Sequence, residues 1–593
     1  MLTVVFLAGF ILYQWKYLPA SVASISFFLP TVRGPASLVR WHESASSCLQ
    51  EAPVIPVTRK SLWLAIEELL HTELFVNKTA SLLSGAVRIP TEVYDVMGPV
   101  GEDPRWEAFA PLHEYLLQAF PLIHMKLQLT KMNTYGLAYV WEGSDGALKP
   151  LLLTAHQDVV PVDPATISNW TYPPYSGHYD GTRIWGRGSA DDKNGLISIL
   201  AAVETLLEHD FAPARTVVLA FGFDEEATGQ QGAKQIGRYL LDIYGENAFA
   251  MLVDEGDPIE DTYGAPFARP AISEKGYFDL QIQVSAPGGH SSVPPPHTAI
   301  GFLSSLIAAY ESGAPRSHLT RGSAAYTHAQ CLAAHAPRLP PNLRADIRAA
   351  HSSDAALRRA EAALFAEDPA LAAGGRTTVA VDVVWGGVKS NALPEGAGVV
   401  VNHRVAVDSS VSALKDHAVA VLRPVADALN VTLVAFPDDG DTLFSRREIS
   451  SVARAGTVTL SDAFGTALEP APVSPTDSAQ WKVLAGTIRA AWGAPHPGLD
   501  RALNKPASVQ VPLQGEAEPD IVVVPSLLAG NTDTQFYWAL TPHIFRYNHY
   551  YARDGPADGS IHTVDEVCEA EGFVGMVKFF VGLMLNADES RDM

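Results

Sequence analysis

Between residues 151 and 254, one His and several acidic residues directly follow short apolar runs. The segments read LLLTAHQD, GRGSADDKNG, VVLAFGFDEE and AMLVDEG. Open parallel sheets present their chemistry in loops at the carboxyl ends of their strands. Buried strand ends seldom carry so many unpaired acids. The pattern predicts an α/β fold with a mainly parallel central sheet and a charged site at one edge of that sheet.

The side chains of these motifs suit a metal site, and no Cys lies among them. They are His156, Asp158, Asp191, Glu225, Glu226 and Asp254. Imidazole with carboxylates suits zinc, and less often manganese or cobalt. The set is large enough for two Zn²⁺ ions that share a carboxylate. In the Glu225-Glu226 doublet, one side chain can face metal while the other removes a proton from water. Taken singly, each motif is more typical of a solvated loop than of a catalytic site, and the prediction depends on their combination.

Composition narrows the class of protein and its partners. The chain has 593 residues and 47% apolar content, enough for two or more domains with full cores. A formal net charge of −23 argues against nucleic acid and anionic membrane surfaces as partners. Cys48, Cys331 and Cys568 lack metal spacing, and three mostly buried free thiols are the favoured interpretation, with one bridge as the alternative.

The N-terminus predicts entry into the secretory pathway. Residues 2–13 are nearly all apolar but shorter than a bilayer span, so residues 1–20 are interpreted as a signal peptide or a signal-anchor. A buried N-terminal helix is the alternative. Sequons at Asn77, Asn169 and Asn430 agree with a glycoprotein.

The order of predicted elements changes near residue 273. From 125 to 272, apolar runs alternate with helical patterns, as in a parallel sheet. Residues 273–470 follow a β-α-β-β-α-β order, which predicts an α+β, ferredoxin-like lid domain with an Ala-rich helical stretch at 313–376. We therefore expect a linker at 21–50, catalytic parts at 51–272 and 471–593, and an inserted lid domain at 273–470.

Two predicted helices depend on local signals. One is expected at 62–75. The other is expected at 565–585, where Thr563 and Glu566 fit a capping box.

The motifs in this order resemble the M20 metallopeptidases, and within them the fungal vacuolar Gly-X carboxypeptidases (carboxypeptidase S). The specific parts are GRGSADDKNG, EKGYFDLQIQVSAPGGHSSVPP, AGNTDTQFYW, HIFRYNHYY and the terminal IHTVDE. The resemblance runs from about residue 50 to the C-terminus. It implies a di-zinc exopeptidase fold. It also implies a protein of the secretory pathway, with the vacuole as the expected compartment and secretion as the alternative.

The resemblance also implies metal-site roles. His156 binds one zinc and Asp158 orients it. Asp191 bridges both ions and precedes a cis peptide bond. Glu225 is the general base, while Glu226 and Asp254 are ligands. The last ligand is His562 in IHTVDE, with His543 in TPHIFRY as the competing candidate.

Further positions resemble the family's substrate-binding residues. His290 in GGHSS matches a lid histidine that helps hold the scissile carbonyl or the oxyanion. Asn391, Arg404 and Gly530 match residues that grip the substrate's terminal carboxylate. Related chains often carry a basic residue where Gln535 stands, so charge at this end is expected from Arg404 or Arg546.

These assignments predict a zinc-dependent carboxypeptidase that acts on short peptides with a free C-terminal carboxylate, with Gly as the expected penultimate residue. The metals and the residues that grip substrate lie on different domains, so domain closure is expected to complete the site. The closest alternative is hydrolysis or synthesis of N-acyl amino acids with the same two-metal site. A catalytically inactive binding protein is disfavoured, because Glu225 and every expected ligand are present.

Overall fold

The computed structural model describes residues 48–437, 455–493 and 520–593. The predicted targeting segment at 1–20 and most of the predicted linker lie outside the described residues.

An eight-stranded sheet forms the centre of the catalytic part. In spatial order its strands are β1 (Gln128–Met132), β2 (Gly136–Trp141), β6 (Val217–Gly222), β3 (Leu151–His156), β7 (Met251–Asp254), β20 (Ile544–Arg546), β10 (Ala271–Glu274) and β19 (Ser526–Leu528). The four middle strands β6, β3, β7 and β20 are mutually parallel. Every residue of β3, β6 and β7 is buried, as expected for strands covered on both faces. The predicted mainly parallel sheet is confirmed.

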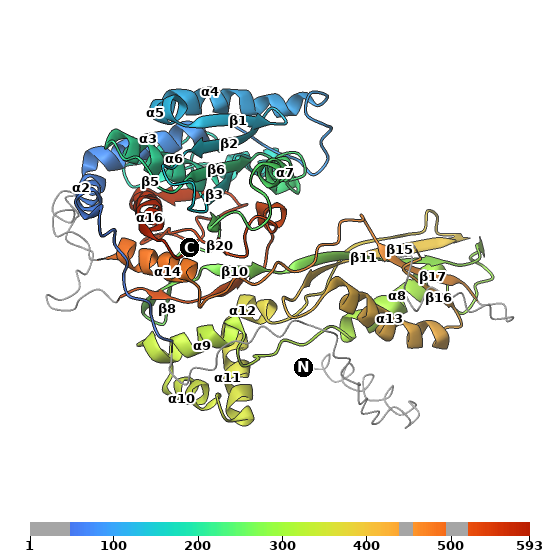
Figure 1. Ribbon diagram of the computed structural model, residues 1–593. Coiled ribbons are helices and arrows are strands. Elements are labelled where there is room, and N and C mark those ends of the chain that lie inside the picture. Colours follow the sequence, from blue (N-terminus) through green and yellow to red (C-terminus); the bar gives the residue numbers. More distant parts are fainter. Residues whose placement is uncertain (1–47, 438–454, 494–519) are drawn as a thin grey trace, which may run out of the picture. The chain divides into compact units, whose positions relative to one another are not determined.

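Helices cover both faces of these strands. Helices α3 (Glu73–Val87), α6 (Lys193–Glu208), α14 (Ala479–Trp492) and α16 (Ala570–Glu589) pack on one another, and α6 contacts β3. Helix α7 (Ala233–Tyr244) contacts β2 and β6. Figure 1 shows α6 and α16 on one side of the sheet and α7 on the other. This layering leaves only the strand ends and their loops free to form a site.

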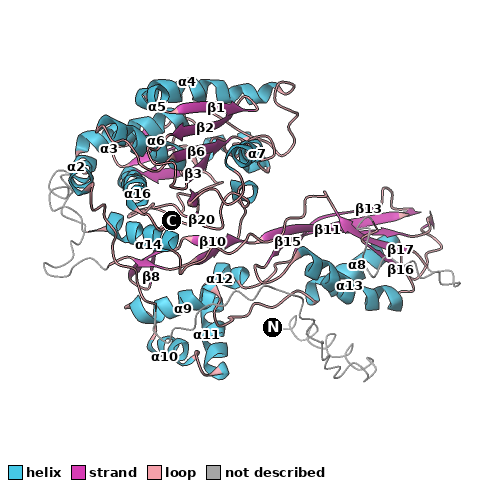
Figure 2. Cartoon of the chain, viewed as in Figure 1, coloured by secondary structure: helices cyan, strands magenta, loops and turns pink. Residues whose placement is uncertain are grey.

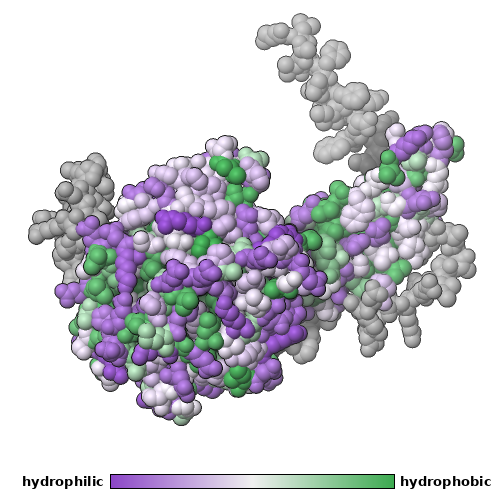
Figure 3. Space-filling model, turned by 90° about the horizontal axis from the view of Figure 1, so that it is seen from above, coloured by the Kyte–Doolittle hydropathy of each residue, from purple (hydrophilic) through white to green (hydrophobic). Residues whose placement is uncertain are grey.

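Helix α16 is the one helix of the described ranges that is long and apolar enough to cross a bilayer, and 89% of its apolar window is buried inside the protein. We therefore assign α16 as a core helix of the protein. The face drawn in Figure 3 carries hydrophilic side chains interspersed with hydrophobic ones, as protein surfaces in water commonly do.

A second sheet of five strands forms the lid domain. Its order is β13 (Ala380–Gly386), β15 (Gly396–Val405), β11 (Gly276–Ser285), β17 (Thr457–Asp462) and β16 (Thr432–Ala435). Helices α8 (Ala299–Ser312) and α13 (Val411–Ala428) pack against it, as Figure 2 shows. Alternate residues of β11 are buried, which matches a sheet with one covered face. The expected α+β lid domain is present, with β17 as an additional central strand.

The Ala-rich stretch between the lid elements has a core of its own. Helices α9 (Ala324–His335), α10 (Pro341–Ala349), α11 (Asp354–Glu367) and α12 (Pro369–Gly374) form this helical insert. Its apolar residues pack with Phe267 on β9 (Ala265–Ala268) and with Val522 on β18 (Val522–Val523). A disulfide joins Cys48 to Cys331 of α9, while Cys568 is free and buried. The expectation of three free thiols is wrong, because this pairing depends on a long-range approach that spacing does not reveal.

Two predicted helix bounds are also corrected. The helix expected at 62–75 is two helices, α2 (Lys60–Leu70) and α3, because the Thr72 hydroxyl accepts the Phe75 N–H and starts a new helix. The terminal helix begins at Ala570 rather than near 565. Residues Val567–Glu569 instead form β21, which pairs with β5 (Arg183–Trp185).

Candidate metal centre

The predicted metal-site residues lie at one edge of the central sheet. His156 ends β3, and its register partner Gly222 ends the parallel neighbour β6. The loop after Gly222 carries the short 3₁₀ helix η4 (Glu225–Ala227). Because parallel strands end at the same edge, these side chains converge. Asp191 joins them from the loop before α6, and its peptide bond with Asp192 is cis, as the resemblance implies.

Buried His156 is the centre of the cluster. Its Nε2 lies 3.0 Å from Asp191 Oδ1 and 3.8 Å from Glu255 Oε1. On the other side of the ring, Nδ1 lies 3.3 Å from Asp158 Oδ1. Asp158 Oδ2 also accepts the backbone N–H of Glu226 at 3.0 Å. Asp158 can therefore orient the imidazole and the loop of Glu226 together, which is the role of a carboxylate behind a metal-binding His.

His562 reaches the same carboxylates from the C-terminal part of the chain. Its Nε2 lies 3.0 Å from Asp191 Oδ2 and 3.3 Å from Glu226 Oε1. Asp191 thus presents one carboxylate oxygen to His156 and the other to His562. The competing candidate His543 precedes β20, where its backbone oxygen accepts the Leu252 N–H. In the described part of the chain it forms no ion pair with these acids.

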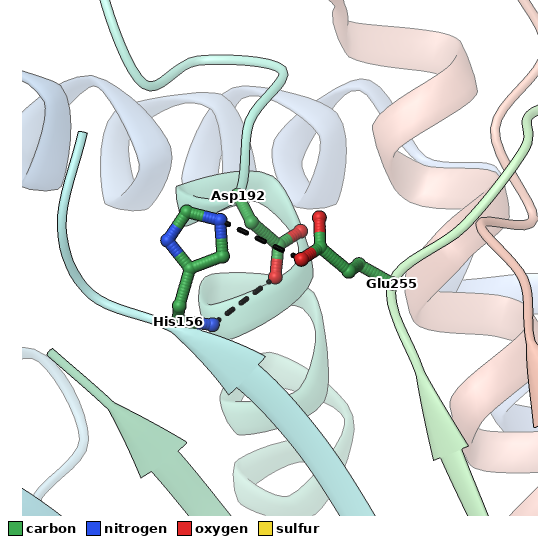
Figure 4. A group of neighbouring side chains, drawn as sticks. All are labelled: His156, Asp192 and Glu255. Atoms are coloured by element: carbon green, nitrogen blue, oxygen red, sulfur yellow. Dashed lines mark hydrogen bonds and ion pairs between the residues drawn. The ribbon is translucent and has the colours of Figure 1, made fainter. Parts of the chain in front are cut away.

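The acid after β7 that faces His156 is Glu255, not Asp254. Asp254 is buried and hydrogen-bonded to Thr154; burial raises its pKa, the charge of Glu274 acts in the same direction and that of Arg546 opposes it. Figure 4 shows the Glu255 carboxylate directed toward the His156 ring, with Asp192 beside it. Ligand atoms of His156, Asp192 and Glu255 lie within 4.8 Å of one another, as do those of His156, Asp191 and Glu226. Sequence analysis missed Glu255 and Asp192. Successive side chains of an extended segment point in opposite directions. This rule could have indicated that the neighbour of a predicted ligand, rather than the predicted residue itself, faces the site.

A buried ion pair supports the loop of Asp191. Glu566 Oε1 accepts the N–H groups of Ala190 and Asp191 at 2.9 and 3.2 Å, and its Oε2 lies 2.5 Å from Arg187 Nη1. The capping-box interpretation of Thr563 and Glu566 is therefore wrong. The Glu566 carboxylate instead fixes the backbone that carries Asp191, which holds that side chain between the two histidines.

The electrostatics of the cluster suit divalent cations. Burial raises the pKa of Glu225 and of Glu255 well above the usual range, and the charge of His156 opposes both shifts. Hydrogen bonds to Asp191 and Glu226 raise the pKa of His562 to about 10. The pKa of Asp191 lies below its usual range. Burial acts to raise this pKa, but the hydrogen bonds with His156 and His562 lower it by more. A divalent cation supplies the positive charge that so many adjacent carboxylates need.

The predicted substrate-binding residues fall into two pairs. His290 on β12 (Gly289–His290) pairs with Ala392 on β14 (Ala392–Leu393), and the Ser291 N–H donates to Asn391 O at 3.2 Å. Both His290 and Asn391 are exposed.

The second pair lies where the lid sheet begins. Arg404 Nη1 donates to Asn531 Oδ1 at 2.9 Å, next to exposed Gly530. Arg546 is fully buried and paired with Glu274, with 3.2 Å between Nη2 and Oε2. The expectation that Arg546 could bind substrate is therefore wrong. Arg404 therefore remains as the predicted carboxylate-binding residue.

An α/β sheet with two histidines and several carboxylates clustered at one edge, from strand ends and nearby loops, defines the class of metal-dependent hydrolases. The model of peptidase family M20/M25/M40 matches residues 152–586, so the chain belongs to this family. Carboxypeptidase S of Saccharomyces cerevisiae is 36% identical over 548 residues, which cover 91% of this chain and 89% of that protein. The resemblance and the expected class, an enzyme that hydrolyses peptide bonds, are confirmed.

Two further comparisons extend this result. An N-fatty-acyl-amino acid synthase/hydrolase of Mus musculus is 29% identical over 86% of this chain and 88% of its own length. Among solved structures, human carnosine dipeptidase 1 aligns with a TM-score of 0.55 over 91% of this chain and 100% of its own, at 14% identity. At that identity the likeness concerns the fold alone, and it agrees with the predicted α/β fold class.

Proposed function

We propose that this protein is a zinc-dependent carboxypeptidase that removes the C-terminal residue of short peptides. One observation carries the proposal: the Asp191 carboxylate has Oδ1 3.0 Å from His156 Nε2 and Oδ2 3.0 Å from His562 Nε2. A carboxylate between two histidines is what a pair of bridged cations requires. The same arrangement is hard to explain as a structural ion pair, because three further acids adjoin it.

The residues divide into two ligand sets around Asp191. His156 and Glu255 would hold one zinc ion, while Glu226 and His562 would hold the other. Two zinc ions bound there would lower the pKa of a water molecule and polarise the substrate carbonyl. Asp158 keeps the His156 ring in place through Nδ1.

Glu225 is the proposed general base. It adjoins Glu226 on η4, and no hydrogen bond with a described residue occupies its carboxylate, which leaves that carboxylate free to accept a proton. In this role it accepts a proton from the attacking water and delivers it to the leaving amine nitrogen. His290 would donate a hydrogen bond to the carbonyl oxygen as negative charge develops there.

The preference for a C-terminal residue is assigned to Arg404, Asn391 and Gly530. A guanidinium matches a carboxylate in a bidentate geometry, so Arg404 would exchange its bond with Asn531 for the substrate carboxylate. Gly in the penultimate position is proposed from the resemblance to carboxypeptidase S.

Hydrolysis or synthesis of N-acyl amino acids is the second candidate. The observation in its favour is the 29% identity with the mouse N-fatty-acyl-amino acid synthase/hydrolase. An N-acyl amino acid presents the same amide and free carboxylate to the same residues, so the two candidates differ only in what lies on the acyl side.

We also propose that the protein works in the secretory pathway, in the vacuole or as a secreted enzyme. The Cys48–Cys331 disulfide supports an oxidising compartment. A single membrane anchor in residues 1–20 and glycosylation at the sequons are part of this proposal.

The test measures release of leucine from a blocked Gly-Leu dipeptide, with chelator and with added zinc. Wild type and Glu225→Gln are compared with Glu246→Gln, a control on an exposed loop. We expect zinc-dependent cleavage that falls about 10²- to 10⁴-fold in Glu225→Gln and persists in the control. Turnover of a long-chain N-acyl amino acid without dipeptide cleavage would select the second candidate. Cleavage that survives both the chelator and Glu225→Gln would contradict both candidates.

A further inference from the structure

A buried lysine sits at the junction between the two sheets. Lys275 is the single residue between β10 of the central sheet and β11 of the lid sheet. Its side chain is almost fully buried, with 1% of the residue exposed, and its Nζ donates to Ala373 O of α12 at 2.9 Å. A buried ammonium group normally has an acidic partner, and here a single backbone carbonyl takes that place.

Two arginines lie close to this lysine. Asn531 Nδ2 donates to Lys275 O at 2.6 Å, and Asn531 Oδ1 accepts from Arg404 Nη1, so one side chain connects Lys275 to Arg404. The Thr378 N–H donates to Arg404 O, and the Arg404 N–H donates to the Thr378 hydroxyl. Exposed Arg376 lies two residues before Thr378. We call Lys275, Arg376 and Arg404 the junction basic cluster.

The junction basic cluster lacks compensating charge. Within the described ranges, none of its three side chains forms an ion pair with a carboxylate, whereas buried Arg187 and Arg546 pair with Glu566 and Glu274. Burial lowers the pKa of Lys275 to about 8, and the charges of Arg404 and Arg376 act in the same direction. Three like charges gathered in this way repel one another, and an anion bound among them relieves the repulsion.

We propose that the junction basic cluster selects substrates whose C-terminal residue has an acidic side chain. Arg404 binds the main-chain carboxylate of the substrate's C-terminal residue, and exposed Arg376 binds its side-chain carboxylate. Buried Lys275 adds positive charge without contacting the substrate. This inference rests on the proposed function, which requires only one cation for one carboxylate. A second carboxylate on the substrate would account for the two additional cations, Lys275 and Arg376.

The experiment compares blocked Gly-Glu with blocked Gly-Gln, because the two side chains have nearly the same shape and differ in charge. In the wild type we expect kcat/KM for Gly-Glu to exceed that for Gly-Gln by about tenfold, the effect of one charge-assisted hydrogen bond. Arg376→Gln should abolish this ratio. Arg358→Gln, which changes an exposed arginine on α11 of the helical insert, should retain it.

Binding provides a measurement that does not depend on catalysis. Calorimetry with N-acetylglutamate and N-acetylglutamine should show the same preference in the wild type and its loss in Arg376→Gln. Equal affinity for the two ligands, or a preference that survives Arg376→Gln, would overturn the inference. If no peptide is cleaved but the binding preference is present, the proposed function fails while the charge selection stands.

Discussion

The proposed metal centre and the proposed substrate-binding residues differ in how far the fold alone brings their side chains together. His156 and His562 come from distant parts of the chain, and the Nε2 of each lies 3.0 Å from one oxygen of the Asp191 carboxylate. His290 and Asn391 instead lie exposed on a two-stranded ribbon, and Arg404 is bonded to Asn531. The difference indicates that contacts within the fold preorganise the proposed metal centre, while the substrate itself is expected to complete its own binding site.

The largest expected effect comes from a substitution in the proposed metal centre, at His562. His562→Ala should lower kcat/KM by more than about a hundredfold, the upper loss for residues that merely support a ligand. The same change at His543, which lacks contact with the cluster in the described structure, is the matched control. Steady-state kinetics at saturating zinc would measure both variants. An equal loss of kcat/KM in the two variants would contradict the role of His562 in the metal centre.

A second change decides which acid after β7 belongs to the metal centre. Glu255→Gln should weaken zinc binding by about 10- to 100-fold, because Glu255 faces His156. Asp254→Asn should weaken it less, since Asp254 is buried beside Thr154. Competition with a chromogenic chelator measures the affinities. The reverse order would restore Asp254 as the ligand.

The sequence was sufficient to predict the residues whose positions depend on strand ends. His156 ends β3 and Glu226 follows its parallel neighbour β6, so the rule that parallel strands end at one edge brings these two side chains together. Asp191 lies instead in the loop before α6, which the rule does not place. Asp254 and Glu255 are adjacent, and the choice between them depends on which way the chain turns after β7. Cys48 and Cys331 are separated by 283 residues, and the core of the helical insert forms against Phe267. Such long-range contacts leave no local pattern in a single sequence.

On the substrate-gripping side, Arg404→Gln is expected to act on binding more than on chemistry. Loss of a charge-assisted bond of about 2 kcal/mol should raise KM about 30-fold, with a smaller change in kcat. Peptides with an amidated C-terminus should be cleaved poorly by the wild type and lose little further activity in the variant. A fall in kcat alone would place Arg404 in the chemistry and weaken the comparison.

The smallest expected effect concerns the stability of the lid domain in acid. Burial lowers the pKa of His403, which lies between Phe278 O and the Tyr310 hydroxyl, to about 4. The unfolded chain binds the proton near pH 6.5, so the folded state loses stability as pH falls through the range from 6.5 to 4. Between pH 6 and 5 this group should cost about 1 kcal/mol. Urea unfolding of wild type and His403→Gln at both pH values checks this, and the variant should show the smaller decline.

The disulfide between Cys48 and Cys331 has a consequence for the lifetime of the molecule. It encloses the strands and loops that carry His156, Asp191 and Glu225, together with the start of the lid sheet. If a protease cut one exposed loop within that stretch, the two fragments would stay covalently joined and held in register by the central sheet. An enzyme that shares its compartment with other proteases could then survive a cut that would separate an unlinked chain.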